Sequence, residues 1–527
     1  MRINKNILFK RRGFVPGLLY LFQFVLLTFP VCGMSNPVRT YNVTGFGAKG
    51  DGKALDTQAI NKAIEKAAED GGGTVYFPAG SYLSFSIHLK SNVGLFLDQG
   101  ATLVAASEKE HQGSYDAPEP NVWGDSLKYQ DFGHSHWHNS LIWGEGLENI
   151  SILGPGTIWG KGLTLKNKVP EGGGNKTIAL KNCHNVTIRD VTILHGGHFA
   201  ILATAADNLT LDNLKIDTNR DAIDVDCCKN VHISNCSVNA PGDDAICLKS
   251  SYALGYARPT ENVTITNCMV SGYDEGTFYD GTFKTEKYKG YPDNNPTGRI
   301  KFGTESNGGF KNITITNCLF YHCRGLCLET VDGGLLEDVT ITNITMRDIR
   351  SAPIFLRLGA RMRGPEDIPV GELRRVMISN VVAYDVDPRF GVIVVGVPGH
   401  PIKDVSFNNI KIYYKGGGTS EMAATMPEDK PESYPEPFLM GVRPSYGFFI
   451  RHAENVELNG VQVSTMMDDK RPAFILDDVN GGGFSRIKAT RTGNIPVFRI
   501  TGGRDINVKG CQHVEDQYLE DVGQSEL

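Results

Sequence analysis

Short segments with alternating apolar and polar residues recur along most of this chain. Consecutive copies begin at Asn185, Asn208 and Asn230, which are 23 and 22 residues apart. Alternation with a period of two is typical of a β-strand with one buried face, and a copy this short cannot bury that face by itself. The copies must therefore stack on one another, which favours a solenoid. Further copies begin at Asn262, Asn312, Asp338, Arg375, Asp404 and Asn455.

The repeat predicts an all-β chain folded as a single-stranded right-handed parallel β-helix, with one coil for each repeat. An eight-stranded sandwich or a propeller is the alternative, although propeller blades need repeats of about 40–45 residues. Two segments between repeats, 271–298 and 414–446, lack periodicity. Loops of that length in a compact fold are usually functional, so we expect them to form walls beside a site.

The end of such a stack exposes strand edges and needs a cover. Residues 56–70 suit a capping helix at the N-terminal end, with Asp56 as the residue that caps the helix. Its apolar face is predicted to contain Ile60, Ala63, Ile64 and Ala67.

Composition excludes several classes of protein. The chain has 527 residues, of which 40% are hydrophobic, so it can bury a large core and is not disordered. Its net charge of −6 offers no basic surface for nucleic acid, and we expect no such partner.

The N-terminus has the pattern of an export signal. A basic start is followed by an apolar run at 18–29 and by small residues around Cys32. The run is shorter than the ~20 residues that a membrane span needs. We expect a signal peptide at 1–33, one domain at 34–527 and a secreted or periplasmic protein, with a lipid anchor on Cys32 as an open alternative.

Cysteines recur at one position of the repeat. A recurring cysteine is more often a small buried hydrophobic residue than half of a disulfide, although two on neighbouring coils could pair. No spacing typical of a metal site occurs, so we expect neither a metal nor a cofactor. The cysteines that follow an asparagine are Cys183, Cys236, Cys268 and Cys318.

Three aspartates are predicted to meet on two consecutive coils. Asp221 and Asp243 each lie 13 residues after the start of a copy, and Asp244 is adjacent. If positions are counted back from the strands that follow, which begin at Ala222 and Ala245, Asp221 pairs with Asp244 instead. Residues one coil apart lie ~4.8 Å apart, so either register crowds three carboxylates together and raises the pKa of at least one. A protonated acid beside an ionised base is what glycosidic hydrolysis requires, whereas a lone aspartate in a turn usually caps backbone amides.

Histidines form two further candidate groups. His198 lies 13 residues after Asn185, on the coil before Asp221, where it would contact substrate, orient a carboxylate or be a satisfied buried histidine. His134, His136 and His138 alternate, so on a strand they would share one face and bind a sugar or a metal; Trp137 and Trp143 nearby favour a sugar-binding wall.

The aspartate motifs resemble those of glycoside hydrolase family 28, the polygalacturonases and rhamnogalacturonan hydrolases. The Asn-Thr-Asp-Gly motif of the family corresponds to Asn-Arg-Asp-Ala at 219–222, and its Gly-Asp-Asp motif to 242–244. The resemblance implies a pectin-lyase-like β-helix and an inverting, pectin-degrading hydrolase. It assigns Asp243 as the general acid, with Asp221 and Asp244 activating water.

Two basic motifs of the family are missing. Gly-His-Gly is expected near 297–299, which reads Thr-Gly-Arg, and Arg-Ile-Lys is expected at 327–329, which reads Cys-Leu-Glu. In the family those positions hold galacturonate carboxylates, so Lys249, Arg299 and Lys301 are candidate replacements. Glu329 in place of a cation suits a neutral sugar hydroxyl such as that of rhamnose. We expect an exo-acting or rhamnogalacturonan-type enzyme that works on a pectic glycan as a monomer.

Two other functions remain open. A pectate lyase on the same fold would cleave by β-elimination, with calcium and an arginine base. A carbohydrate-binding β-helix would use the aspartates only to cap turns, but binding alone does not need stacked carboxylates.

Overall fold

The computed structural model describes residues 39–121, 123, 128–288 and 295–527. The predicted signal peptide and Cys32 lie outside these residues. Residues 39–527 make up one contact unit built from stacked coils.

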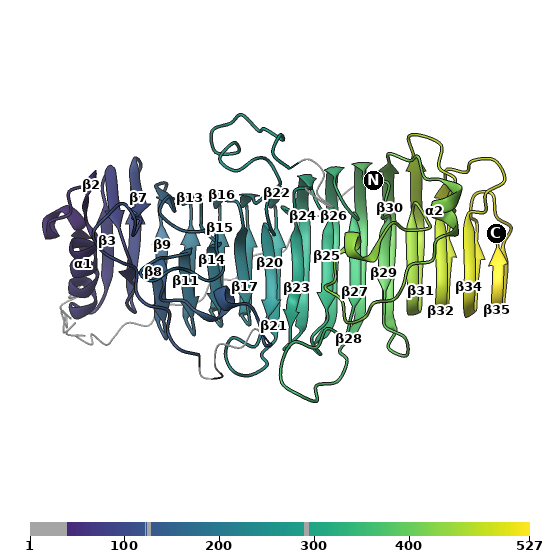
Figure 1. Ribbon diagram of the computed structural model, residues 1–527, viewed down its shortest axis with the longest axis horizontal. Coiled ribbons are helices and arrows are strands. Elements are labelled where there is room, and N and C mark those ends of the chain that lie inside the picture. Colours follow the sequence, from purple (N-terminus) through teal and green to yellow (C-terminus); the bar gives the residue numbers. More distant parts are fainter. Residues whose placement is uncertain (1–38, 122, 124–127, 289–294) are drawn as a thin grey trace, which may run out of the picture. The chain divides into compact units, whose positions relative to one another are not determined.

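The coils form a parallel β-helix with three faces, as the repeat predicted (Figure 1). One complete coil contains β14 (Phe199–Thr204), β15 (Asp207–Asp212) and β16 (Lys215–Asp217), and each pairs in parallel with the equivalent strand of the next coil. The inward-facing side chains form one continuous apolar core along the stack.

The strands are distributed over the faces as follows. The first face contains β5 (Ile87–His88), β8 (Ser140–Glu145), β11 (Lys176–Lys181), β14, β17 (Asp221–Asp226), β20 (Ile246–Ser250), β23 (Ile300–Ser306), β25 (Leu326–Thr330), β27 (Ile354–Leu358) and β29 (Val392–Val395). The second contains β1 (Thr40–Asn42), β3 (Gly73–Phe77), β6 (Val93–Leu97), β9 (Glu148–Leu153), β12 (His184–Arg189), β15, β18 (Lys229–Ser234) and β21 (Thr260–Thr266). The third contains β2 (Asp51–Leu55), β4 (Gly80–Ser84), β7 (Ala101–Ala105), β10 (Thr157–Trp159), β13 (Thr192–Leu194), β16, β19 (Ser237–Asn239), β22 (Met269–Ser271) and β33 (Lys488–Ala489).

Longer strands turn the corner between faces in the C-terminal half. The second and third faces are joined by β24 (Phe310–Cys323), β26 (Leu335–Ile349), β28 (Glu372–Val386) and β30 (Ile402–Tyr414). The stack continues through β31 (Phe448–Thr465), β32 (Phe474–Ser485) and β34 (Phe498–Lys509). The last strand, β35 (Gln517–Glu526), pairs with β34 in the antiparallel sense and covers that edge.

The asparagines that open each repeat form a ladder along one corner of the stack. The side-chain amide of Asn208 donates to Asn185 at 3.1 Å, that of Asn230 to Asn208 at 3.1 Å, and that of Asn262 to Asn230 at 3.0 Å. Each of these residues has φ between 50° and 59°, a left-handed conformation that asparagine tolerates better than most residues. The repeated asparagine is therefore a structural requirement of the corner.

The N-terminal cap is α1 (Thr57–Glu69), and its predicted apolar face is buried. Asp56 precedes the helix, but its side chain makes no capping hydrogen bond, contrary to the prediction. It accepts hydrogen bonds from the amides of Lys49 and Gly50 instead, at 2.6 and 3.0 Å. The carboxylate thus holds the preceding turn, because those two amides lie within its reach.

The cysteines of the described residues are all free and buried, which fits the prediction that they serve as small apolar side chains. No helix within the described ranges combines the length and apolar character that a bilayer crossing needs.

The first face differs from the other two because it is buried on both sides. The strands β14, β17, β20, β23 and β25 contain only buried residues, whereas those of the other faces mostly alternate. The outer side of this face is covered by chain segments that include η2 (Phe132–Ser135) and η3 (Pro437–Met440). Polar side chains on it are therefore held away from water.

Candidate active site

The structure brings the three predicted aspartates together at one end of the first-face strands. Asp221 begins β17, and Asp243 and Asp244 lie in the turn before β20. The register aligns Ile223 with Ile246, so Asp221 stacks on Asp244, as the count from the following strands predicted. One carboxylate oxygen of each aspartate lies within 4.8 Å of the other two. We refer to Asp221, Asp243 and Asp244 as the carboxylate cluster.

Asp244 is the ionised member of the cluster. Its Oδ1 accepts a hydrogen bond from Nε of Arg299 at 2.7 Å, and Nζ of Lys301 lies 3.5 Å from its Oδ2. Burial of the side chain opposes ionisation, but the charges of Lys301, Arg299 and Lys249 outweigh it and lower the pKa of Asp244. Asp244 is therefore a carboxylate that can accept a proton from water.

Asp221 has the opposite character. Its side chain is buried, and its Oδ1 has no hydrogen-bond partner in the described part of the chain. Burial, followed by repulsion from Asp224 and Asp243, raises the pKa of Asp221 well above its usual value, against the attraction of Lys249 and Arg220. The cluster thus pairs a carboxylic acid with a carboxylate one coil away.

Asp243 is the most accessible member, with 27% of its side chain exposed. Nη2 of Arg220 lies 2.7 Å from its Oδ2. Arg220 was not among the predicted site residues, although it lies directly before Asp221 where the family motif has threonine. Its side chain reaches across to the next coil, which the sequence alone did not indicate.

A buried ionic network surrounds Asp244. Glu436 accepts hydrogen bonds from Arg299 and from Nη1 of Arg324, the latter at 2.9 Å, and Nζ of Lys301 lies 3.9 Å from its Oε1. Glu436 comes from the predicted 414–446 insertion, so that segment does reach the site. Sequence reasoning missed Glu436 because nothing local distinguishes it from other loop carboxylates.

Glu329 lies at the edge of this network on β25. Its Oε2 is 3.7 Å from Nζ of Lys301, and Sγ of Cys327 donates to its Oε1 at 2.8 Å. Burial and the charge of Glu436 raise the pKa of Glu329 to about 7, against the attraction of Lys301 and Arg299. Glu329 therefore changes its protonation state near neutral pH.

The remaining predicted residues surround the cluster. Nζ of Lys249 lies 3.3 Å from Oε2 of Glu305. His198 shares a hydrogen bond with the carbonyl of Leu165 through Nδ1 (2.8 Å), and burial together with the charge of Arg220 lowers its pKa to about 2. Arg299, Lys301 and Lys249 all have protein carboxylates as partners, so they hold the site together in addition to any contact with substrate.

The three alternating histidines, His134, His136 and His138, do not share a face. Residues 132–135 form the 3-10 helix η2 rather than a strand, and the three side chains diverge. His134 approaches Asp224 (3.7 Å), His136 shares a hydrogen bond with the carbonyl of Glu119 (2.7 Å), and His138 lies 2.9 Å from Glu145. Trp137 is fully buried and donates to Thr204, so it cannot form the expected sugar-binding wall.

Both predicted insertions contact the surroundings of the cluster. Nδ2 of Asn219, two residues before Asp221, donates to the hydroxyl of Tyr288 at 2.7 Å. In addition, Nη2 of Arg363 lies 3.0 Å from Asp131, and Nζ of Lys128 lies 2.9 Å from Glu366. These two ion pairs join segments that are more than 200 residues apart in sequence, beside the first face.

Comparisons with known proteins agree with this geometry. The model of "Glycosyl hydrolases family 28" matches residues 126–273, which contain the whole carboxylate cluster. The model "Rhamnogalacturonase A/epimerase, pectate lyase-like" matches residues 40–126.

Individual relatives cover different shares of the chain. A probable polygalacturonase of Vitis vinifera is 25% identical over 71% of this chain and 74% of its own length. An exo-poly-α-D-galacturonosidase of Dickeya chrysanthemi is 26% identical over 44% of this chain and 45% of its own. The crystal structure of an exopolygalacturonase from Thermotoga maritima shares the fold, with a TM-score of 0.55, 18% identity and coverage of 93% of this chain and 96% of that one. Residues 126–273, which contain the stacked aspartates, therefore match family 28 of the glycosyl hydrolases, and the relatives named polygalacturonase and the shared fold agree with that match.

Proposed function

We propose that the protein is an exported, exo-acting hydrolase of galacturonate-containing pectic glycans. The observation that carries this proposal is the carboxylate cluster, in which three aspartate carboxyl groups from two coils meet and Lys301 and Arg299 keep Asp244 ionised. Glycoside hydrolysis needs a base for the attacking water and an acid for the leaving oxygen. The polygalacturonase and exo-galacturonosidase names of the relatives support the pectic substrate.

The charges of the cluster support a division of roles. Asp244 accepts the proton of the attacking water, and Asp221 orients that water from the same side. Asp243 is the most accessible carboxyl group and delivers a proton to the leaving glycosidic oxygen. Arg220 then stabilises the carboxylate that remains on Asp243. The attacking water gives one proton to Asp244, and the leaving glycosidic oxygen receives one proton from Asp243, so the protons balance.

Replacing each aspartate by asparagine tests these roles. Asp243→Asn, Asp244→Asn and Asp221→Asn should each lower the release of reducing ends by about 10²–10⁴-fold, the range for loss of acid–base catalysis. Asp190→Asn is the matched control, because Asp190 lies in a corner ladder where it accepts from Asn213. Full activity in Asp243→Asn or Asp244→Asn would overturn the assignment.

The stereochemistry of the product tests the single-displacement mechanism. Proton NMR of the first product formed should show inversion at the anomeric carbon. Retention would instead require one aspartate to act as a nucleophile.

The segments around the cluster support action at chain ends. The 271–288 segment reaches Asn219, the 414–446 segment supplies Glu436, and ion pairs join 128–131 to 363–366. Walls on several sides favour a pocket that accepts a chain terminus over an open groove.

A rhamnogalacturonan substrate is the second candidate. Glu329 occupies a position where the family pattern has a cation, so a positive partner for a galacturonate carboxylate is missing there. The match of residues 40–126 to the rhamnogalacturonase-type model also favours it. Activity measured on a panel of polygalacturonan, rhamnogalacturonan and their oligosaccharides distinguishes the two candidate substrates.

The same panel tests the other functions. An unsaturated, ultraviolet-absorbing product would indicate a lyase, and binding of a glycan without release of any product would indicate a carbohydrate-binding protein.

A further inference from the structure

A second polar group lies next to the carboxylate cluster, on the outer side of the first face. Asp224 is the fourth residue of β17 and is completely buried. His134, from η2, is 4% exposed and packs edge-on against Phe199 with ring centroids 4.7 Å apart. Nε2 of His134 lies 3.7 Å from Oδ2 of Asp224.

These side chains have unused polar atoms. Both ring nitrogens of His134, both carboxylate oxygens of Asp224 and Oδ1 of Asp221 are buried without a hydrogen-bond partner among the described residues. A buried polar atom without a partner costs about 1–3 kcal/mol, and a buried carboxylate costs more. By contrast, Asp226 on the same strand accepts hydrogen bonds from the amide and hydroxyl of Ser251, at 2.8 and 2.6 Å.

We propose that His134, Asp221 and Asp224 form a site for one divalent transition-metal ion, with Zn²⁺ the best match. One potential ligand atom of each residue lies within 4.8 Å of the other two. Donors that share a zinc ion are about 2.0–2.2 Å from it, so they lie at most about 4.4 Å apart. Small side-chain rotations therefore bring the three donors into range. An imidazole with two carboxylates suits zinc, whereas Mg²⁺ prefers oxygen ligands alone.

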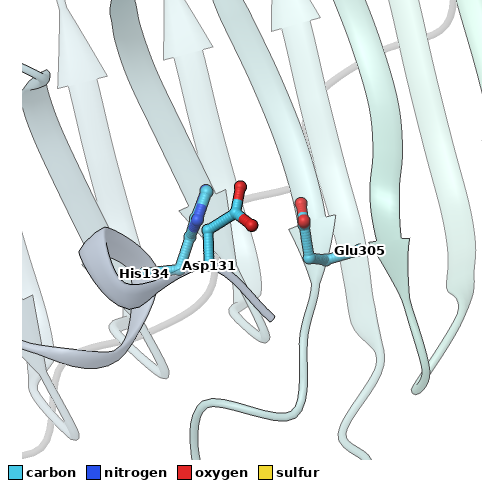
Figure 2. A group of neighbouring side chains, drawn as sticks. All are labelled: Asp131, His134 and Glu305. Atoms are coloured by element: carbon cyan, nitrogen blue, oxygen red, sulfur yellow. The ribbon is translucent and has the colours of Figure 1, made fainter. Parts of the chain in front are cut away.

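Neighbouring groups with similar composition are less suitable because cations already pair with them. Figure 2 shows Asp131, His134 and Glu305, which also lie within 4.8 Å of one another. Arg363 lies 3.0 Å from Asp131 and 3.7 Å from Glu305, and Lys249 lies 3.3 Å from Glu305.

The carboxylate cluster has the same disadvantage. Arg220 pairs with Asp243, and Arg299 and Lys301 pair with Asp244. Within the described ranges, neither Asp221 nor Asp224 forms an ion pair with a lysine or arginine at 4.0 Å or less, although the charge of Lys249, whose Nζ lies 3.3 Å from Glu305, acts on both from farther away. The carboxyl groups of Asp221 and Asp224 therefore keep oxygen atoms that no cation contacts directly.

The site shares Asp221 with the carboxylate cluster, so a bound ion removes that carboxyl group from hydrolysis. Zn²⁺ should therefore inhibit the enzyme, and a chelator should restore activity. The binding measurement does not depend on the substrate, so failure of the proposed function and failure of this inference remain distinguishable.

Isothermal titration calorimetry of the chelator-treated protein with Zn²⁺, Mn²⁺ and Mg²⁺ tests the site. We expect one equivalent of Zn²⁺ to bind more tightly than Mg²⁺ and to raise the melting temperature. His134→Ala and Asp224→Asn should each weaken Zn²⁺ binding at least tenfold. Asp131→Asn is the matched control, because it removes a ligand only from the group in Figure 2, and it should leave the affinity unchanged.

Three outcomes would overturn the inference. The first is no zinc binding to the wild-type protein, and the second is zinc binding that His134→Ala does not change. The third is a loss in Asp131→Asn as large as that in His134→Ala, which would place the ion in the other group. Circular dichroism of each variant excludes unfolding as the cause, and His134→Gln provides a second variant if His134→Ala does not fold.

Discussion

At the scale of single residues, neighbouring charges decide what each carboxyl group does. Asp221 and Asp244 have the same side chain and stack on consecutive coils, yet their pKa values shift in opposite directions. Asp244 has Arg299 and Lys301 as direct partners, whereas Asp221 faces Asp224 and Asp243. The chemistry of the site therefore depends on Arg299, directly before β23, and Lys301, within it, as much as on the aspartates themselves.

Arg220 offers a test of this view at Asp243. Arg220→Met should remove the cation that stabilises the carboxylate left on Asp243 after proton transfer, so we expect kcat to fall by about 10–100-fold, the equivalent of one hydrogen bond to a charged group. Arg220→Lys should retain most of the wild-type kcat, because the charge remains. An unchanged kcat in Arg220→Met would show that Arg220 does not act on Asp243 during the reaction.

Glu329 should make stability depend on pH. Its pKa is raised to about 7 from 4.5, so between these values the folded protein binds more protons than the unfolded chain. Stability should therefore fall as pH rises from about 4.5 to 7, by on the order of 3 kcal/mol from this group.

Denaturant unfolding of the wild type and Glu329→Gln at pH 5 and pH 7.5 measures this effect. The variant should lose less stability than the wild type between the two pH values. Equal losses of stability would mean that Lys301 and Arg299 keep Glu329 ionised at both pH values.

At the scale of elements, the corner ladder explains why the repeat begins with asparagine. Asn230 has φ of 58°, donates to Asn208 and accepts from Asn262. Asn230→Ala should lower the free energy of unfolding by about 1–3 kcal/mol, because it removes both hydrogen bonds and strains the left-handed backbone.

Asn230→Gly is the control, because glycine loses the same hydrogen bonds but adopts a positive φ without strain. It should be more stable than Asn230→Ala by about 1 kcal/mol in denaturant unfolding. The reverse order would show that the ladder contributes through its hydrogen bonds alone.

At the scale of the whole molecule, the covered first face should determine where a polymer is cut. A site with walls from 271–288 and 414–446 should release short products from chain ends. We expect reducing ends to accumulate from polygalacturonan while the viscosity of the solution falls slowly. A rapid fall in viscosity at low product yield would indicate cleavage within the chain and contradict exo action.

Much of the architecture follows from local pattern. The period-two alternation and the spacing of 22–23 residues can be satisfied only by stacking, so the β-helix, the buried cysteines and the apolar face of α1 were predictable. The spacing of the copies also placed the three aspartates on neighbouring coils, and the count from the following strands predicted the observed pair, Asp221 with Asp244.

Tertiary structure decided the partners of those residues. Arg220, Arg299 and Glu436 reach the carboxylate cluster from different coils and from an insertion, and no local period encodes such contacts. The histidine row was predicted incorrectly for the same reason. Residues 132–135 form the 3-10 helix η2 instead of a strand, and the partners of its side chains come from the first face of the stack. The repeat makes the stacking of neighbouring coils predictable from the sequence. The charge state of each carboxyl group depends instead on side chains that only folding brings together.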